Sequence, residues 1–367
     1  MENHDKKITV DLGPRSYDIL IGYKIIDQLG SILEKLNLGQ DAVIITNQTI
    51  HHLHGGHLHS HLSRYGYSTR FMLVADSERS KSYKTCLDLI EKIAAYDTKK
   101  KIFIIAFGGG VIGDLSGFIA SIYKRGIPYI QIPTTFLAQV DSSIGGKTGI
   151  DLASGKNLIG SFYQPRLVFS DISFLRTLSL KQIRNGMAEV IKYGVIKDRA
   201  LFGYIEKNYK NILQLNIESI EKIVYACSKI KSGVVENDEL DKTGKRATLN
   251  LGHTIGHAIE AAAGFTKEYS HGEAVAIGMV CAADISVKLG LLAAGDAKRI
   301  ENVFKKIGLP VACSNLKLEQ IMQAQSHDKK FIHGTNRFVL PVGIGKVTLK
   351  EGIPADIVEQ AVSRRIK

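Results

Sequence analysis

The sequence lacks closely spaced cysteine pairs and long hydrophobic runs. Its four cysteines, Cys86, Cys227, Cys281 and Cys313, lie far apart and form no CxxC pair. This spacing favours reduced thiols and a cytoplasmic location. The first residues, MENHDKK, are polar, and the longest uncharged apolar stretch, within EAVAIGMVCAAD, is far shorter than the ~20 residues that a membrane span needs. We therefore expect neither a signal peptide nor a membrane anchor.

A basic stripe interleaved with aromatic residues is also absent, although the formal net charge is +12. A positive charge of this size can attract nucleic acid, an acidic membrane surface or a multiply anionic small substrate. The lysines and arginines are scattered through helical segments, with only short clusters such as residues 99–101. This scatter is typical of a solvated surface, so we expect no nucleic-acid partner.

What is present is a chain of 367 residues with 44% hydrophobic and 23% charged residues, as in ordinary globular proteins. Its length suggests two domains, which we place at residues 1–177 and 178–367. The first part alternates predicted strands with helices, and a 3.6-residue period begins at about Leu178. We predict strands at 8–12, 17–22, 42–46, 70–75, 102–107, 129–133 and 167–171, then helices at 180–196, 217–235, 254–263, 273–290 and 297–308, two short strands at 337–342 and 346–349, and a last helix from Pro354. The fold class is therefore an α/β Rossmann-like N-terminal domain followed by a mostly α-helical C-terminal domain.

Glycines follow the apolar run 102–107 in the pattern Gly108-x-Gly110-x-x-Gly113, which is the spacing of a dinucleotide-binding turn. A Rossmann unit also needs an acidic residue about 20 residues later to hold the ribose. Here the next apolar run ends in Pro133-Thr134-Thr135, and other strand-like runs precede the one that leads into the glycines, whereas this fingerprint usually follows the first strand. A nucleotide site and a glycine turn without a nucleotide both remain open from the residues alone.

Three histidines gather in the helical half, and His253 and His257, four residues apart, share one helical face. His271 follows in SHGEA. Imidazole nitrogen suits Zn²⁺, and catalytic zinc sites use three protein ligands, so we favour a metal site over three core histidines. Glu189, on an apolar helical segment, is a candidate carboxylate companion. Lys192 shares its face, so the two residues alternatively form an exposed ion pair.

Further polar groups fall into two sets and one histidine-rich segment. Lysines on glycine-rich loops bind phosphate and carboxylate groups as point charges, although a solvated loop is the alternative. The segment HHLHGGHLHSHL, residues 51–62, contains no carboxylate or cysteine, and we interpret it as a surface helix or loop with incidental metal affinity. The first set contains Arg125, Asp141, Lys147, Lys156 and Asn157, and the second contains Lys231, Arg246 and Asn250.

These motifs, in this order and over nearly the whole chain, resemble the 3-dehydroquinate synthase family. The resemblance is carried by GGGVIGDLSGFIA, IPTTFLAQVDSSIGGKTGID, GKNLIGSFYQP, MAEVIKYG, LNLGHTIGHAIEA, HGEAVAIGM and DKK. It implies a dehydroquinate synthase-like fold with NAD against the N-terminal domain, a Zn²⁺ or Co²⁺ ion in the helical domain, and a homodimer. One departure is visible: the usual DExExGxR is replaced by DELDKTGKR, which leaves open whether Asp241 acts for the second glutamate.

Carried over position by position, the resemblance implies that Glu189, His253 and His271 hold the metal. His257 would then face the substrate, which corrects the pairing of the two helix-face histidines. The implied NAD contacts are Asp76, Glu78, Lys81, Gly110, Val111, Ile112, Gly113, Asp114, Thr134, Thr135, Asp141, Lys147, Lys156, Phe174, Leu175, Arg176 and Thr177. The implied substrate and catalytic residues are Arg125, Lys147, Asn157, Lys192, Lys231, Arg246, Asn250 and His257, with Lys329 or Lys330.

The implied reaction converts 3-deoxy-arabino-heptulosonate 7-phosphate to 3-dehydroquinate and phosphate in the shikimate pathway. Transient oxidation by NAD⁺ acidifies a neighbouring C–H bond, phosphate leaves by β-elimination, the hydride returns, and an aldol step closes the ring. The nearest alternative is another sugar phosphate cyclase, such as a 2-epi-5-epi-valiolone synthase. A simple NAD-dependent polyol dehydrogenase is a further alternative, and it would accumulate NADH.

Overall fold

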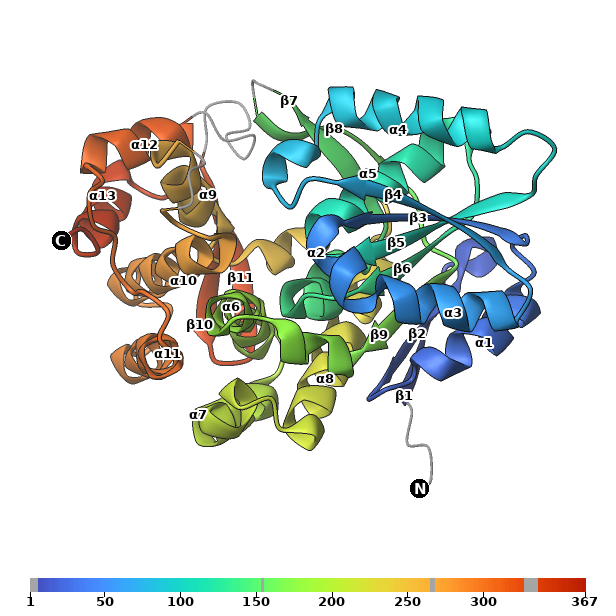
Figure 1. Ribbon diagram of the computed structural model, residues 1–367. Coiled ribbons are helices and arrows are strands. Elements are labelled where there is room, and N and C mark those ends of the chain that lie inside the picture. Colours follow the sequence, from blue (N-terminus) through green and yellow to red (C-terminus); the bar gives the residue numbers. More distant parts are fainter. Residues whose placement is uncertain (1–5, 153–154, 265–267, 327–335) are drawn as a thin grey trace. The chain divides into compact units, whose positions relative to one another are not determined.

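The structure is a computed structural model that describes residues 6–152, 155–264, 268–326 and 336–367 (Figure 1). Its contacts divide the chain into two compact units, Met1–Leu178 with Ile220–Leu240, and Ser179–Ser219 with Asp241–Lys367. The predicted domain ranges stay a prediction, and they differ from these units in one segment. Most of helix α8 (Ile217–Asn237) groups with the first unit because its side chains bind there: Lys231 pairs with Asp141, and Glu236 accepts a hydrogen bond from the backbone of Asp11.

A seven-stranded sheet forms the centre of the first unit, in the order β1-β2-β9-β6-β5-β3-β4. All pairs of neighbouring strands are parallel except β1 with β2. The seven predicted strands are confirmed as these seven, so the continuous apolar runs identified the sheet correctly. Their bounds are β1 Lys6–Val10, β2 Tyr17–Gly22, β3 Asp41–Asn47, β4 Ser68–Val74, β5 Ile102–Gly108, β6 Tyr129–Pro133 and β9 Leu167–Asp171.

Helices cover both faces of this sheet, as parallel sheets require (Figure 1). Because side chains alternate along a strand, β5 divides its own between two cores. Phe103, Ile105 and Phe107 pack with helices α1 (Leu29–Leu36) and α3 (Gly56–Arg64). Ile102, Ile104 and Ala106 pack with α4 (Tyr83–Tyr96) and α5 (Gly110–Ile122). Every residue of β5 is buried, which fixes the glycine turn that follows it.

An antiparallel hairpin, β7 (Lys147–Leu152) with β8 (Gly155–Phe162), was not predicted from the sequence. Its glycines conceal it, since glycine usually weakens a strand. They are needed because the two backbones approach closely. A Cβ on Gly149 would lie 2.6 Å from the carbonyl oxygen of Ile159, and one on Gly160 would lie 2.3 Å from that of Thr148.

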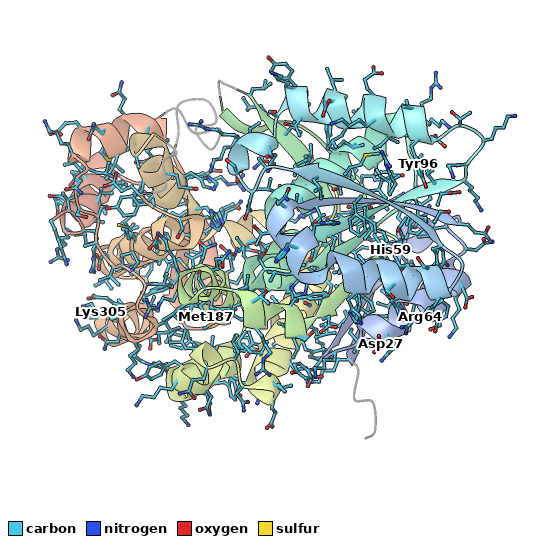
Figure 2. All side chains as sticks on the ribbon, viewed as in Figure 1. Asp27, His59, Arg64, Tyr96, Met187 and Lys305 are labelled. Carbon is cyan, nitrogen blue, oxygen red and sulfur yellow. The ribbon has the colours of Figure 1, made fainter. Side chains whose placement is uncertain are left out.

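The histidine-rich segment forms a continuous helical stretch, Gln48–Ile50, His51–Gly55 and α3. Its side chains are not all on the surface. His61 is 6% exposed, its Nε2 accepts the backbone N–H of Gly30 at 3.3 Å, and its Nδ1 lies 3.7 Å from Oδ1 of Asp27. Figure 2 labels this aspartate together with His59 and Arg64 of α3. The predicted helix is confirmed, but His61 is buried in the core, whereas the segment was predicted to lie on the surface. Among the described residues, no group with metal-ligand geometry includes a histidine of this segment.

The second unit is mostly helical, and the predicted helices that belong to it are confirmed. Helices α7 and α12 were not predicted. The two predicted short strands are confirmed as β10 (Arg337–Gly343) and β11 (Lys346–Glu351), which pair antiparallel. Among the described residues, no helix is both long enough and apolar enough to cross a membrane. The helices are α6 Leu180–Ile196, α7 Arg199–Leu213, α9 His253–Ala262, α10 His271–Lys288, α11 Ala294–Ile307, α12 Leu318–Ser326 and α13 Ala355–Ser363.

Candidate functional site

The carboxyl ends of β3, β4 and β5 lie together at one edge of the sheet. After β3 the chain adds β4 on one side and returns to place β5 on the other, so this edge is a topological switch point. Ligands of open α/β sheets bind outside such points. Asp76 follows β4 there, and its Oδ1 accepts a hydrogen bond from Nδ2 of Asn47 at 2.9 Å. Asn47 was missed by the sequence analysis, although its place at the end of a buried strand was a usable signal.

The glycine turn leads from β5 into α5 at the same edge. Gly109 occupies the N-cap position and has no side chain to cap the first turn, so the first N–H groups of α5 are available to an anion. Gly113 lies where a Cβ would be 2.7 Å from Gln131 of β6. Thr134 donates its backbone N–H to the carbonyl of Gly108 at 2.9 Å, which brings the Thr134–Thr135 pair beside the turn. This geometry fits a pyrophosphate.

Two of the expected NAD contacts, 33 residues apart, form a buried ion pair. Nζ of Lys81 lies 2.6 Å from Oδ2 of Asp114, and Lys81 is 4% exposed. Burial opposes the charged ammonium, but the carboxylate of Asp114 outweighs this effect and raises the pKa of Lys81. Glu78, which is exposed, lies close enough to the same lysine for its carboxylate to interact with the ammonium charge. The segment DSERSK is therefore held to α5, the helix that follows the glycine turn, by the ion pair between Lys81 and Asp114.

The remaining NAD candidates take several positions. Val111 is partly exposed, whereas Ile112 belongs to the core below the turn. The segment Ile172–Thr177 forms a 3₁₀-helix in which Phe174 and Leu175 are buried. The Phe174 ring packs against Phe107 at 5.6 Å between centroids. Arg176 is exposed and donates to the hydroxyl of Tyr23 at 3.0 Å.

Lys231 of α8 and Asp141 also meet, although the sequence analysis placed one with the substrate and the other with NAD. Nζ of Lys231 lies 2.6 Å from Oδ1 of Asp141 and 2.8 Å from its backbone oxygen. Three other polar candidates of this unit are more accessible. Lys147 and Asn157 on the β7–β8 hairpin are exposed, and Lys156 is partly exposed.

Arg125 ends a short turn after α5 whose backbone is unusual. Lys124, Arg125 and Gly126 have φ of 50°, 67° and 122°, a left-handed run that costs free energy for the two residues with a Cβ. The turn exposes the guanidinium of Arg125 to solvent. Such strain is often found at functional positions, which supports the choice of this arginine.

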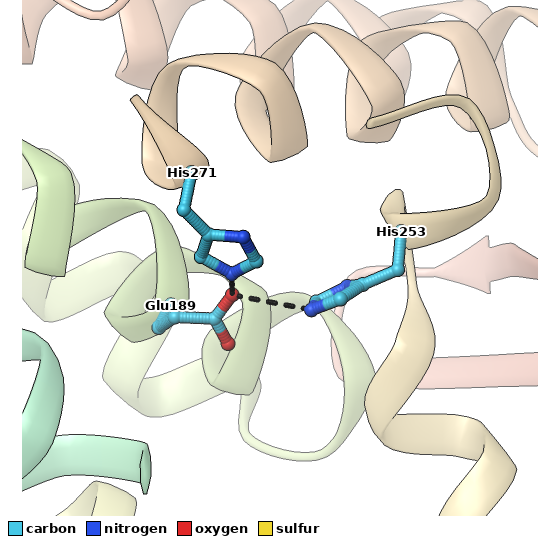
Figure 3. Close-up of side chains that lie close together, drawn as sticks. All are labelled: Glu189, His253 and His271. Carbon is cyan, nitrogen blue, oxygen red and sulfur yellow. Dashed lines mark ion pairs between the residues drawn. The ribbon is translucent and has the colours of Figure 1, made fainter. Parts of the chain in front are cut away.

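The second unit brings Glu189, His253 and His271 together (Figure 3). Glu189 on α6 is completely buried. Its Oε1 lies 3.6 Å from Nε2 of His253, at the start of α9, and 3.5 Å from Nε2 of His271, at the start of α10. Lys192, one helical turn after Glu189 and 2% exposed, makes an ion pair with Oε2. The alternative of an exposed Glu189–Lys192 pair is wrong, because both residues are buried.

Two glycines of α10 allow α6, α9 and α10 to approach closely enough to bring the three side chains together. A Cβ on Gly278 of α10 would lie 2.0 Å from the carbonyl oxygen of Gly252, which precedes His253. A Cβ on Gly272 would lie 2.2 Å from the carbonyl oxygen of Asn185 on α6. Gly272 also donates its N–H to Oδ1 of Asn185 at 2.6 Å, which fixes the start of α10, and therefore His271, against α6.

This cluster fits a divalent metal ion. Bonds of about 2.1 Å at a tetrahedral angle place two ligand atoms about 3.4 Å apart, close to the observed nitrogen–oxygen distances of 3.5 and 3.6 Å. One carboxylate with two imidazoles is the donor set of several catalytic zinc sites. Burial alone would lower the pKa of His271, but contacts with Glu189 and Glu260 raise it to about 10 in the metal-free protein. A metal would therefore displace a proton when it binds.

The remaining candidates of this unit take several positions. His257 is exposed, and its ring centroid lies 5.3 Å from that of His253. Arg246, 3% exposed, and Asn250 lie in a 3₁₀-helix, Arg246–Asn250, that packs against α6. Asp241 has a φ of 56° and is partly exposed. Lys329 and Lys330 lie outside the described residues.

Comparisons with known proteins agree with this architecture. Residues 71–185 match the family model described as 3-dehydroquinate synthase N-terminal, and residues 186–331 match 3-dehydroquinate synthase C-terminal. A 3-dehydroquinate synthase from Desulforamulus reducens is 43% identical over 95% of this chain and 98% of the relative. Another from Pelotomaculum thermopropionicum is 41% identical over 97% of this chain and 96% of the relative.

Solved structures show the same fold with other names. A 2-epi-5-epi-valiolone synthase from Streptomyces hygroscopicus, with NAD⁺ and Zn²⁺ bound, is 25% identical over 95% of this chain and 96% of its own, with a TM-score of 0.87. A 2-deoxy-scyllo-inosose synthase complexed with carbaglucose-6-phosphate, NAD⁺ and Co²⁺ is 25% identical over 98% of this chain and 100% of its own, with a TM-score of 0.89. An iron-containing alcohol dehydrogenase is 16% identical over 95% of this chain and 97% of its own, with a TM-score of 0.66, a likeness in fold alone.

Proposed function

The chain belongs to the 3-dehydroquinate synthase family, and from this premise we infer how its residues perform the family's reaction. It is an enzyme with 3-dehydroquinate synthase activity, a carbon–oxygen lyase of the shikimate pathway that releases phosphate from 3-deoxy-arabino-heptulosonate 7-phosphate. The observation that carries the proposal for the site is the buried Glu189–His253–His271 cluster in this fold.

We propose that Glu189, His253 and His271 hold Zn²⁺ or Co²⁺, and that NAD binds at the switch point of the sheet. When bound, the metal supplies Lewis-acid polarisation of a substrate hydroxyl, and NAD accepts and returns a hydride. The uncapped start of α5 supports the NAD site, as do the two cyclases whose structures contain NAD⁺. The donor set supports the metal.

The chain's own residues supply positioning and proton transfer in this proposal. His257 is exposed beside the cluster, and an imidazole nitrogen can both accept and donate a proton, so it can carry a proton to or from a substrate oxygen. Lys192 offsets the buried charge of Glu189, which would otherwise be costly. The basic candidate residues carry the charge that binds the phosphate and carboxylate groups of the substrate. They are Arg125, Lys147, Lys231 and Arg246, with Asn157 and Asn250 as amide partners.

Two further expectations accompany the proposal. The four cysteines are buried thiols that form no disulfide in the part of the chain that the structure describes, which supports a reducing, cytoplasmic environment. Family resemblance supports a homodimer, which light scattering on the purified protein would test.

The deciding experiment measures phosphate release in the presence of NAD⁺ and Zn²⁺. We expect release from 3-deoxy-arabino-heptulosonate 7-phosphate, little from sedoheptulose 7-phosphate, no net NADH, and loss of activity with a chelator. Release from sedoheptulose 7-phosphate alone would transfer the chain to a neighbouring cyclase. Net NADH without phosphate release would favour a polyol dehydrogenase.

A further inference from the structure

Both imidazoles of the candidate metal site present the same nitrogen to Glu189. Nε2 of His253 and Nε2 of His271 face Oε1 of this carboxylate at 3.6 and 3.5 Å. A neutral imidazole binds a metal through one nitrogen while the other carries the proton. The partner of each Nδ1 therefore decides whether Nε2 is free to bind the metal.

The backbone decides this for His253. Its Nδ1 lies 3.1 Å from the carbonyl oxygen of Leu251. A carbonyl only accepts hydrogen bonds, so Nδ1 must hold the proton and Nε2 must be the metal-facing nitrogen.

A carboxylate occupies the corresponding place beside His271. Oε2 of Glu260 lies 3.6 Å from Nδ1 of His271, on the side of the ring away from Glu189. Glu260 is 6% exposed and lies on α9, the helix that begins at His253. A buried carboxylate is costly without a hydrogen-bonding or charged partner, and the ring of His271 provides one. Glu260 was not predicted from the sequence, although it lies seven residues after His253 on the same helical face.

We propose that Glu260 is a positioning residue that accepts the Nδ1 proton of His271 and thereby directs Nε2 of this histidine to the metal. The proposal rests on the proposed metal site and adds a residue outside the expected ligand set. Glu260 acts through His271 and touches neither substrate nor metal. A competing interpretation makes Glu260 a ligand itself, because atoms of His257, Glu260 and His271 also lie within 4.8 Å of one another. The two interpretations differ in the proton on Nδ1 and in the number of metal ions bound.

The test compares three variants of the full chain. Glu260→Gln keeps an acceptor oxygen and removes the charge, and Glu260→Ala removes both. Glu273→Gln is the matched control, since Glu273 lies on α10 two residues after His271 and its carboxylate accepts the N–H and the hydroxyl of Ser270 at 2.8 and 2.7 Å. Glutamine keeps this capping role while removing the same charge.

Zinc affinity and stoichiometry are measured by competition with a chromogenic chelator. We expect Glu260→Gln to bind zinc about 10-fold more weakly and Glu260→Ala about 100-fold more weakly, with one equivalent bound in each, because loss of such a partner typically costs 10–100-fold. Glu273→Gln should remain within about 2-fold of the unmodified protein. Unchanged affinity in Glu260→Gln would overturn the proposal even if Glu260→Ala does not fold.

Nuclear magnetic resonance of protein labelled with ¹⁵N-histidine gives a readout that a general packing defect does not change. In the zinc-loaded protein, Nδ1–H of His271 should give a slowly exchanging ring signal that persists in Glu260→Gln and is lost in Glu260→Ala. A second zinc equivalent that disappears with Glu260 would instead make it a ligand. If the unmodified protein binds no zinc, the proposed metal site is wrong. If all variants bind zinc equally well, only the role proposed for Glu260 is wrong.

Discussion

Nζ of Lys231 lies 2.6 Å from Oδ1 of Asp141, which joins α8 to the segment that follows the Thr134–Thr135 pair, across 90 residues of sequence. The pair is largely shielded, with side-chain exposures of 9% and 20%. It explains why part of a helix from the middle of the chain groups with the N-terminal unit.

Removing one partner of this pair should destabilise the protein. In Lys231→Met the carboxylate of Asp141 loses its cation, and breaking a shielded pair costs about 3 kcal/mol. Urea unfolding measures the change. The control is Lys92→Met, which removes an exposed i,i+4 pair with Asp88 and should cost less than about 0.5 kcal/mol. Equal losses in the two variants would contradict the structural role of the Lys231–Asp141 pair.

Two neighbouring histidines should respond differently to alanine. His271→Ala removes one of the three proposed metal ligands, so zinc should be lost on dialysis, as measured by atomic emission. His257→Ala should retain one zinc per chain while turnover falls at least about 100-fold, because a proton carrier is missing. Similar zinc losses in both variants would show that this division of roles is wrong.

The close approach of α9 and α10 should be intolerant of one added methyl group. Gly278→Ala would place a Cβ 2.0 Å from a backbone oxygen, and we expect a loss of about 2–4 kcal/mol in the free energy of unfolding together with weaker zinc binding. Gly203→Ala serves as the control, since it lies inside α7 with no atom within 4 Å of a new Cβ. That change should stabilise the protein by about 0.5–1 kcal/mol. A stable Gly278→Ala protein with full zinc affinity would refute the packing argument.

Acid should destabilise the protein partly through His61. Burial lowers the pKa of this imidazole, an effect that Asp27 opposes and that His57 and Arg64 reinforce. Because the folded pKa lies below the unfolded value of about 6.5, the unfolded chain binds the proton first, and stability falls as the pH drops through this range. Below about pH 6.5, His61→Gln should make the free energy of unfolding less dependent on pH. The decrease in slope should correspond to the uptake of at most one proton on unfolding. Above pH 8 the difference between the two proteins should be independent of pH, and an unchanged acid slope would exclude His61 as a source.

Much of the fold could be predicted because buried strands and helices have recognisable patterns of apolar residues in the local sequence. The apolar run 102–107 indicated a strand covered on both faces, and 180–196 matched α6 at both ends through its helical period. The β7–β8 hairpin could not be predicted, because Gly149 and Gly160 have no side chains to mark a face. Their requirement appears only when two backbones meet at short distance.

By itself the sequence determined the candidate residues for the chemistry: the glycines after β5, the carboxylate of Glu189, and the two histidines at the starts of α9 and α10. Only the tertiary structure decided how they are oriented. Periodicity assigns a residue to a face of its own helix, but it cannot state what another helix places opposite that face. That Nε2 of both His253 and His271 faces Glu189, with Glu260 behind His271, follows from the packing of α6, α9 and α10, whose contacts join residues that are distant in the sequence.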